Sequence, residues 1–160
     1  MDLRLYHNSH EFYYRSSFGA VPSGSRLILR LRAGGSDARN CRARIRLWQS
    51  NVGESFVPMT YQDGIFTGCV TMPPKGCLVW YYFIVDDGHE TVYYGNNYDR
   101  LGGEGAKYPE VPPAYQVTVY DKDAHTPDWF KHAIVYQIFP DRFFNGDKSN
   151  DNARANAHVR

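Results

Sequence analysis

Oxygen-bearing side chains gather in one loop near the end of the 160-residue chain. The stretch "IVYQIFPDRFFNGDKSND" (residues 134–151) runs from an apolar segment into a loop rich in Asn and Asp. Carboxylate and amide oxygens are the ligands that calcium prefers. The twelve-residue spacing and terminal Glu of an EF-hand are absent. Two interpretations therefore stay open from the residues: a metal-binding loop, or a turn made by Asn, Asp and Gly.

Aromatic side chains are the second group of residues that could bind a ligand. They make up 16% of the sequence, and thirteen residues are Tyr. An aromatic ring offers a flat apolar face, to which Tyr adds a polar tip, so it suits both packing within a sheet and stacking on a sugar. Composition alone does not choose between the two roles.

The charge balance argues against two classes of partner. Eighteen basic and seventeen acidic residues give a net charge of +1. No strong field is therefore expected to draw the chain to nucleic acid or to a membrane surface. The one basic cluster, Arg39, Arg42, Arg44 and Arg46, alternates along a predicted strand and is interpreted as its solvent face.

Cysteine usage and the N-terminus predict a soluble, cytoplasmic protein. Cys41, Cys69 and Cys77 are odd in number and follow no CxxC or metal-ligand spacing, which is typical of reduced thiols. The N-terminal residues lack the apolar core of a signal peptide, and no apolar run is long enough to span a bilayer.

Period-two alternation predicts an all-β fold for most of the chain. Leu27, Leu29 and Leu31 alternate with arginines in one such run, and Asp63-Gly64 is a strong hairpin signal between two others. Residues 77–86 are apolar on both faces, which predicts a central strand. About seven strands separated by turn residues are typical of an immunoglobulin-like antiparallel β-sandwich. The predicted strands lie at residues 25–33, 41–49, 55–62, 65–72, 77–86, 89–95 and 114–121.

Two further segments are interpreted from local signals. Leu101–Gly105 ("LGGEG") lacks the pattern of a phosphate-binding loop and is expected to be a flexible surface loop. A second unit is expected to begin within residues 121–133, whose charged, Pro-containing start is interpreted as a linker. This segment includes one predicted helical turn, capped by Thr126 with Pro127 in first position. Ala133–Phe139 ("AIVYQIF") is apolar almost throughout, as a parallel strand buried on both faces would be.

Residues 128–151 resemble the start of the catalytic barrel in glycoside hydrolase family 13, the α-amylase family. The likeness is strongest to its neopullulanase, cyclomaltodextrinase and maltogenic amylase branch, where a W…YQIFPDRF strand leads into an Asn/Asp calcium loop. Upstream, "WYYFIVDDG" (80–88) and "YYGNN" (93–97) are similar to the starch-associated β-sandwich that precedes this barrel.

The resemblance implies a retaining hydrolase of α-glucosidic bonds whose three catalytic carboxylates lie on later barrel strands. A (β/α)₈ barrel needs roughly 250 residues, so no catalytic residue is assigned here and the chain alone is expected to be inactive. The family's calcium ligands map onto Asn145, Asp147, Asn150 and Asp151, and weak calcium binding is expected because the other ligands come from a later loop. Asp141 and Arg142 are interpreted as fixing this loop, and Tyr136 as a packing residue.

The resemblance also implies that exposed aromatic residues of the sandwich stack on α-glucan. The candidates are Trp48, Trp80, Tyr82, Tyr93, Tyr94 and Tyr98. Core packing is favoured for Trp80 and Tyr82, whereas Trp48, Tyr94 and Tyr98 are expected to be exposed. For these three the alternative is that the sandwich packs on the barrel or mediates dimerisation.

We therefore expect a starch-associated sandwich over residues 1–121, a linker over 122–128 and the incomplete start of a barrel over 129–160. The main hypothesis is the N-terminal part of an α-glucan hydrolase, with α-glucan or cyclodextrin as substrate. Its sandwich would assist substrate binding, packing on the missing barrel, or formation of a homodimer. The alternatives are a free-standing α-glucan-binding module and a purely structural immunoglobulin-like interaction domain. The predicted barrel strand favours the main hypothesis, because in a free-standing module it would be an exposed apolar edge.

Overall fold

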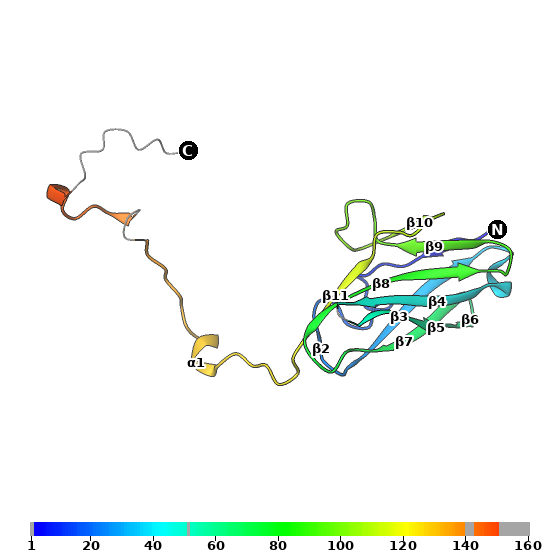
Figure 1. Cartoon of the computed structure of the whole chain (residues 1–160), viewed down its shortest axis with the longest axis horizontal. Coiled ribbons are helices and arrows are strands. Elements are labelled where there is room, and N and C mark those ends of the chain that lie inside the picture. Colours follow the sequence, from blue (N-terminus) through cyan, green and yellow to red (C-terminus); the bar gives the residue numbers. More distant parts are fainter. Residues whose placement is uncertain (1, 51, 140–142, 151–160) are drawn as a thin grey trace. The chain divides into compact units, whose positions relative to one another are not determined.

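The computed structural model describes residues 2–50, 52–139 and 143–150. It divides the chain into two units, Met1–Ala124 and His125–Arg160. The first unit holds eleven strands (Figure 1). They are β1 (Arg4–Tyr6), β2 (Val21–Pro22), β3 (Arg26–Gly34), β4 (Arg42–Gln49), β5 (Gly53–Pro58), β6 (Thr60–Gln62), β7 (Ile65–Thr71), β8 (Cys77–Asp86), β9 (Thr91–Gly95), β10 (Ala106–Tyr108) and β11 (Tyr115–Tyr120); a 3-10 turn, η1 (Ala38–Asn40), precedes β4.

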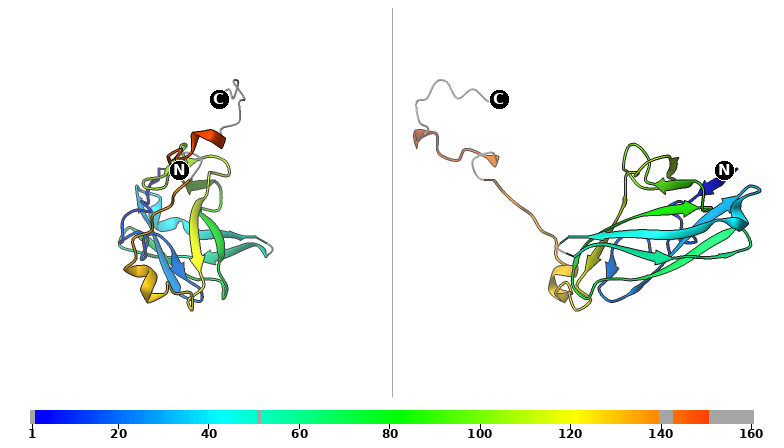
Figure 2. Two further views of the ribbon diagram at one scale, coloured as in Figure 1. Left: turned by 90° about the vertical axis from the view of Figure 1, so that its left-hand side faces the viewer. Right: turned by 45° about the vertical axis from the view of Figure 1, so that its right-hand side comes forward.

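The strands form two sheets, which confirms the predicted all-β sandwich (Figure 2). The smaller sheet has the order β1-β3-β7-β6. The larger one has the order β10-β9-β8-β11-β2. In addition, β4 pairs with β8, and β5 pairs with β4. All pairs are antiparallel except β2 with β11, which run parallel. β8 is central, as predicted, since it pairs with β4 on one edge and with β9 and β11 on the other.

The core lies between the two sheets and follows the alternation in the sequence. Leu27, Leu29 and Leu31 of β3 are buried, and they share one hydrophobic cluster with Ala43 and Ile45 of β4. β8 differs from a simple alternating strand because residues on both of its faces are buried. Its inward face joins the core. Its outward Tyr82 and Ile84 are also buried, and Tyr82 is covered by Arg46 and contacts Tyr93 of the same sheet.

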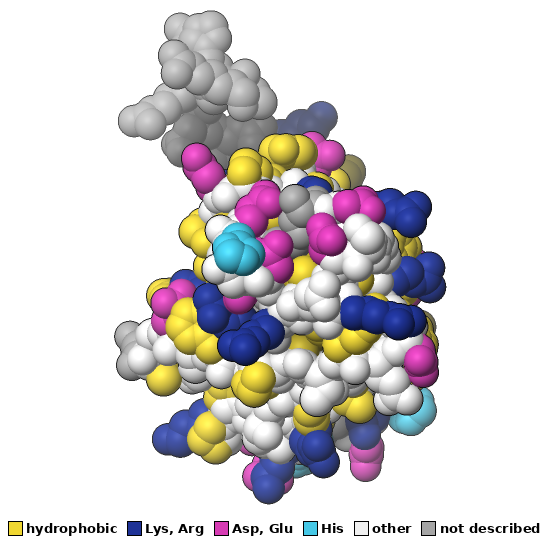
Figure 3. Space-filling view, turned by 90° about the vertical axis from the view of Figure 1, so that its right-hand side faces the viewer, with side chains coloured by type: hydrophobic (Ala, Val, Ile, Leu, Met, Phe, Trp, Pro, Cys, Tyr) yellow, Lys and Arg dark blue, Asp and Glu magenta, His cyan; other side chains and the backbone are white. Residues whose placement is uncertain are grey.

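On the molecular surface, acidic and basic side chains are interspersed with hydrophobic ones on the face shown in Figure 3. Within the described part of the chain, no helix has the length and apolar character needed to cross a membrane.

The second unit contains only short helical turns in its described residues. These are α1 (Asp128–Lys131) and a 3-10 turn, η2 (Lys148–Asn150). The predicted helical turn is present, but Pro127 rather than Thr126 is its N-cap residue, and no side chain caps it. Residues 133–139 form no strand here, in contrast to the prediction. A parallel strand needs neighbours to satisfy its backbone groups, and no described residue pairs with this segment. The barrel start and the domain boundaries therefore stay predictions.

Candidate functional site

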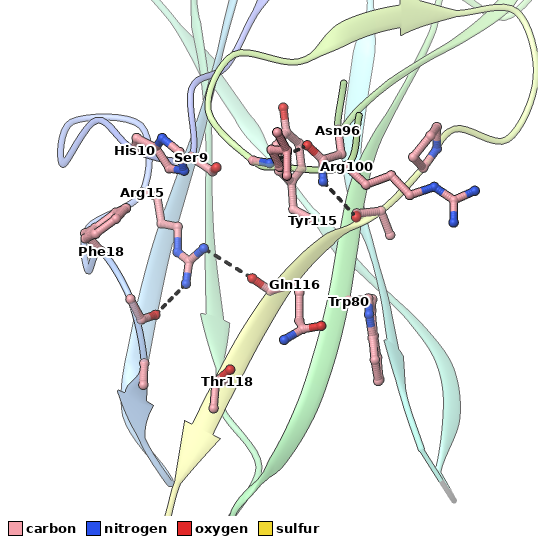
Figure 4. Close-up of a pocket in the computed structure, with 16 residues that line it drawn as sticks. Ser9, His10, Arg15, Phe18, Trp80, Asn96, Arg100, Tyr115, Gln116 and Thr118 are labelled. Carbon is pink, nitrogen blue, oxygen red and sulfur yellow. Dashed lines mark hydrogen bonds between the residues drawn. The ribbon is translucent and has the colours of Figure 1, made fainter. Parts of the chain in front are cut away.

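A groove of about 630 Å³ crosses the outward face of β11 (Figure 4). Its floor is formed by Gln116 and Thr118, which project outward from β11 because alternate residues of a strand point to opposite faces. His10 and Phe18 of the loop between β1 and β2 lie on one side, and Trp80 of β8 lies on the other. Arg100 and Gly102 of the loop after β9 also line the groove, so four segments far apart in the sequence meet at one surface.

The β1–β2 loop is fixed in place by hydrogen bonds. The Arg15 guanidinium donates to the carbonyl of Gly19 (2.7 Å) and to that of Gln116 on β11 (3.3 Å). Ser9 and Gly103 exchange two bonds of 2.9 Å, Ser9 N to the Gly103 carbonyl and Gly103 N to Ser9 Oγ. These contacts join the loop to the floor of the groove and to the loop after β9.

Two asparagine side chains hold the loop after β9 through hydrogen bonds. Asn96 Oδ1 accepts from the backbone N–H of Asn97 (2.9 Å) and of Gly102 (3.0 Å), and Asn97 Nδ2 donates to the Gly102 carbonyl (2.6 Å). Gly102 has φ of +78°, and an added Cβ would lie 2.9 Å from Nε2 of His10. The loop therefore needs glycine here, both for its backbone and for the approach of His10.

Two tryptophan rings lie side by side at one edge of the groove, the edge that Trp80 forms. Trp48 and Trp80 are directly paired across β4 and β8, and their rings are 5.1 Å apart and inclined by 59°. Trp48 is 37% exposed and Trp80 is half-buried. Glu54 pairs with Trp48 and Gln116 with Trp80, so one row of side chains crosses four strands of the outward face. Two inclined aromatic planes beside polar groups suit a ligand with apolar faces and many hydroxyl groups.

The other predicted sugar-binding residues do not join this row. Tyr82 and Tyr94 are buried, so neither offers a ring face to a ligand. The Arg46 guanidinium covers the Tyr82 ring at 5.2 Å, while Tyr94 points inward, donates to the His7 carbonyl (3.1 Å) and has its pKa raised to about 12 by burial. The burial of Tyr82 agrees with the core packing favoured from sequence, whereas the exposure expected for Tyr94 is wrong.

Tyr93 and Tyr98 lie away from the groove. Tyr93 is half-buried and contacts the Tyr82 ring edge-on at 6.1 Å. Tyr98 is 78% exposed in the loop after β9 and packs against Tyr108 at 5.3 Å.

Sequence reasoning missed the residues that form most of the groove. His10, Phe18, Arg100 and Gln116 come from two loops and one strand, with no shared motif or spacing. The aromatic run "FYYRSSF" (12–18) was the one visible signal, because its residues fall outside any predicted strand.

The predicted metal loop is only partly described. Asn145 and Asp147 are exposed, Asn150 closes η2, and Asp151 lies outside the described residues. Asn145 Oδ1 accepts from Asp147 N (3.2 Å), and Asp147 Oδ1 accepts from both N and Oγ of Ser149 (2.9 and 2.6 Å). The Ser149 bonds lower the pKa of Asp147. Across the described residues there is no cluster of three or more His, Cys, Asp or Glu side chains placed to hold a metal.

The remaining assignments in this region are placed as follows. Tyr136 is 73% exposed rather than packed, in contrast to the prediction. Asp141 and Arg142 lie outside the described residues.

Comparison with known proteins finds relatives over almost the whole chain, although no protein-family model matches it. An amylopullulanase of Thermoanaerobacterium thermosulfurigenes is 41% identical over 164 residues, which cover 94% of this chain and 8% of the amylopullulanase. Neopullulanase 2 of Thermoactinomyces vulgaris is 69% identical over 63 residues, covering 39% of this chain and 10% of the neopullulanase. A cyclomaltodextrinase of Thermoanaerobacter pseudethanolicus is 36% identical over 81 residues, covering 46% of this chain and 13% of the cyclomaltodextrinase. The chain therefore spans only 8% to 13% of the length of these relatives.

Proposed function

We propose that this chain, which belongs to the neopullulanase, cyclomaltodextrinase and maltogenic amylase branch of glycoside hydrolase family 13, is the part of an α-glucan hydrolase that holds the glucan on its β-sandwich. The hydrolytic activity would belong to the whole enzyme, and no residue of this chain is assigned a catalytic role. The observation that supports glucan binding is the partly exposed Trp48–Trp80 pair at the edge of the groove. Because successive rings of an α-1,4-linked glucan are not coplanar, two planes inclined by 59° suit adjacent glucose units better than a flat platform would.

Removal of the tryptophan pair tests this proposal. Trp48→Ala and Trp80→Ala are each expected to weaken binding of maltoheptaose by about tenfold, since a tenfold loss corresponds to about 1.4 kcal/mol and aromatic anchors typically contribute more than 1 kcal/mol. Affinity electrophoresis in amylose gels and calorimetric titration would measure the loss. Phe12→Ala is the matched control, because Phe12 is 71% exposed and does not line the groove. Equal binding by wild type and both tryptophan variants would contradict the proposal.

We also propose that Asn145, Asp147, Asn150 and Asp151 contribute oxygen ligands to a calcium ion. The oxygen chemistry fits calcium, which would supply a structural tie within the loop. Two features oppose tight binding: four side chains provide about half of the six to eight ligands that calcium takes, and Asp147 Oδ1 already accepts two bonds from Ser149.

Calorimetric titration of the chain with calcium should therefore give a Kd in the millimolar range, weakened further by Asp147→Asn. The reason is that the site offers few ligands and little rigidity. Asp123→Asn, an exposed carboxylate outside the loop, is the control and should leave the titration unchanged. A micromolar or tighter Kd for the wild-type chain would disprove a weak site.

We propose, finally, that residues 133–139 pack against further barrel strands in the whole enzyme. Their large apolar side chains are exposed here, with Ile134 97% exposed and Tyr136 73% exposed. Exposed apolar stretches of this kind usually mark a surface that other structure covers. A cytoplasmic location is proposed as well, supported by three cysteines, all within the described residues, that form no disulfide.

A further inference from the structure

The groove carries positive charge without any acidic residue. Its basic lining residues are Arg15, Arg100 and His10, and no Asp or Glu is among the described residues that line it. The whole chain has almost equal numbers of basic and acidic residues, so this imbalance is local to the groove. The floor residues Gln116 and Thr118 offer both donors and acceptors to the hydroxyl groups of a sugar, whereas the basic residues add donors and positive charge that a neutral sugar does not need.

Arg15 is the most unusual of the three because it is a nearly buried cation. It is 7% exposed, and its guanidinium donates to the carbonyls of Gly19 and Gln116. Its Nε has no hydrogen-bond partner, and no carboxylate of the described residues forms an ion pair with it. A buried charge is costly unless it is compensated. An anion held in the groove would supply the missing opposite charge.

His10 and Arg100 present further donors on opposite sides of the floor (Figure 4). The His10 ring is held edge-on against Phe18 at 5.3 Å and close to Gly102, which fixes its orientation. Arg100 is exposed at the tip of its loop with φ of +59°, a conformation that non-glycine residues seldom adopt. The Asn97 carbonyl, which accepts from Arg100 N at 3.0 Å, and Asn97 Oδ1, which accepts from Leu101 N at 3.2 Å, hold this conformation.

We propose that the groove recognises phosphomonoester groups carried on an α-glucan, so that the chain binds phosphorylated α-glucan in preference to neutral α-glucan. The rings of Trp80 and Phe18 provide apolar walls for the sugar, and Arg100 and His10 provide donors for the phosphate. A phosphomonoester carries about −1.5 to −2 charges at pH 7, and arginine binds phosphate through charge-assisted bonds. This inference rests on the proposed glucan-binding function and adds the chemical class of the preferred glucan.

Binding of phosphorylated amylopectin and of the same material after phosphatase treatment tests the inference. Wild-type chain should bind the phosphorylated form about tenfold more tightly, and Arg100→Gln and His10→Gln should each remove most of this preference. Arg42→Gln is the matched control, since Arg42 is an exposed arginine of β4 that does not line the groove, and it should keep the preference. Raising the salt concentration should reduce the preference of the wild type, because partly exposed charges are screened.

Competition experiments identify the chemical group that the groove recognises. Glucose 6-phosphate should displace the phosphorylated glucan, while inorganic phosphate and polyglutamate should do so at least tenfold less well. Equal displacement by inorganic phosphate or by polyglutamate would overturn the inference. Equal affinity for phosphorylated and neutral glucan would also overturn it and leave the proposed function intact. Failure of the wild type to bind either glucan would instead contradict the proposed function itself.

Discussion

Replacing Gly105 with alanine is expected to lower the free energy of unfolding by about 3 kcal/mol or more. Gly105 lies just before β10, where an added Cβ would overlap with the Gly95 carbonyl oxygen and with Tyr115 Oη. The first obstacle is backbone, and Tyr115 is 1% exposed within the core, so neither can move away cheaply. Gly105 N also donates to the His7 carbonyl at 3.2 Å, which ties this point to the N-terminal segment.

Urea unfolding followed by tryptophan fluorescence would measure the loss. Gly34→Ala is the matched control: an added Cβ there meets only the end of the flexible Arg4 side chain at 4.0 Å, so the stability should change by less than about 1 kcal/mol. Since Gly105 follows the loop that carries Arg100, any folded fraction of Gly105→Ala should also bind glucan less well. A stability equal to that of wild type would show that the packing around Gly105 is looser than the structure indicates.

The periodic parts of the fold could be predicted because their pattern is local. Leu27, Leu29 and Leu31 alternate with arginines, and the structure buries these three leucines. The long apolar run of β8 indicated a central strand for the same reason. Pairing across the sheet is different: Trp48 and Trp80 are both candidates from sequence, but only the register of β4 against β8 shows that they are neighbours.

The groove could not be predicted because it depends on loops whose conformation is set by distant contacts. Arg15 lies beside the Gln116 carbonyl across 101 positions of sequence, and Ser9 binds Gly103 across 94. Neither pair leaves a local signal. For Tyr94, strand alternation could indicate two faces but not which face points inward, and the structure places it inside.

A buried histidine makes the stability of the sandwich depend on pH in a defined range. His7 is fully buried among the rings of Tyr14, Tyr81, Phe83 and Tyr115. Its Nδ1 lies 2.7 Å from the Arg30 carbonyl, which can only accept, so Nδ1 carries the hydrogen. Nε2 then accepts from Tyr81 Oη at 3.0 Å. This arrangement fits the neutral ring, because a second proton on Nε2 would displace the hydrogen that Tyr81 Oη donates to it.

Burial lowers the pKa of His7 from 6.5 to about 4, and the positive charge of Arg15 acts in the same direction. Above pH 6.5 the histidine is neutral in both folded and unfolded chains, so it adds no pH dependence. Between pH 6.5 and pH 4 the unfolded chain binds a proton that the folded chain does not, and the free energy of unfolding falls as the pH decreases. The total loss expected by pH 4 is about 3 kcal/mol, at 1.36 kcal/mol for each pKa unit.

Urea unfolding at half-unit steps from pH 7.5 to pH 4.5 would show this decline for the wild-type chain. His7→Gln should be less stable at pH 7 but nearly independent of pH between 6.5 and 5, because no buried imidazole remains to be protonated. His89→Gln removes an exposed histidine from the turn between β8 and β9 and should keep the wild-type slope. Carboxylates titrate mainly below this range, so a slope in His7→Gln equal to that of wild type would assign the acid sensitivity to another group.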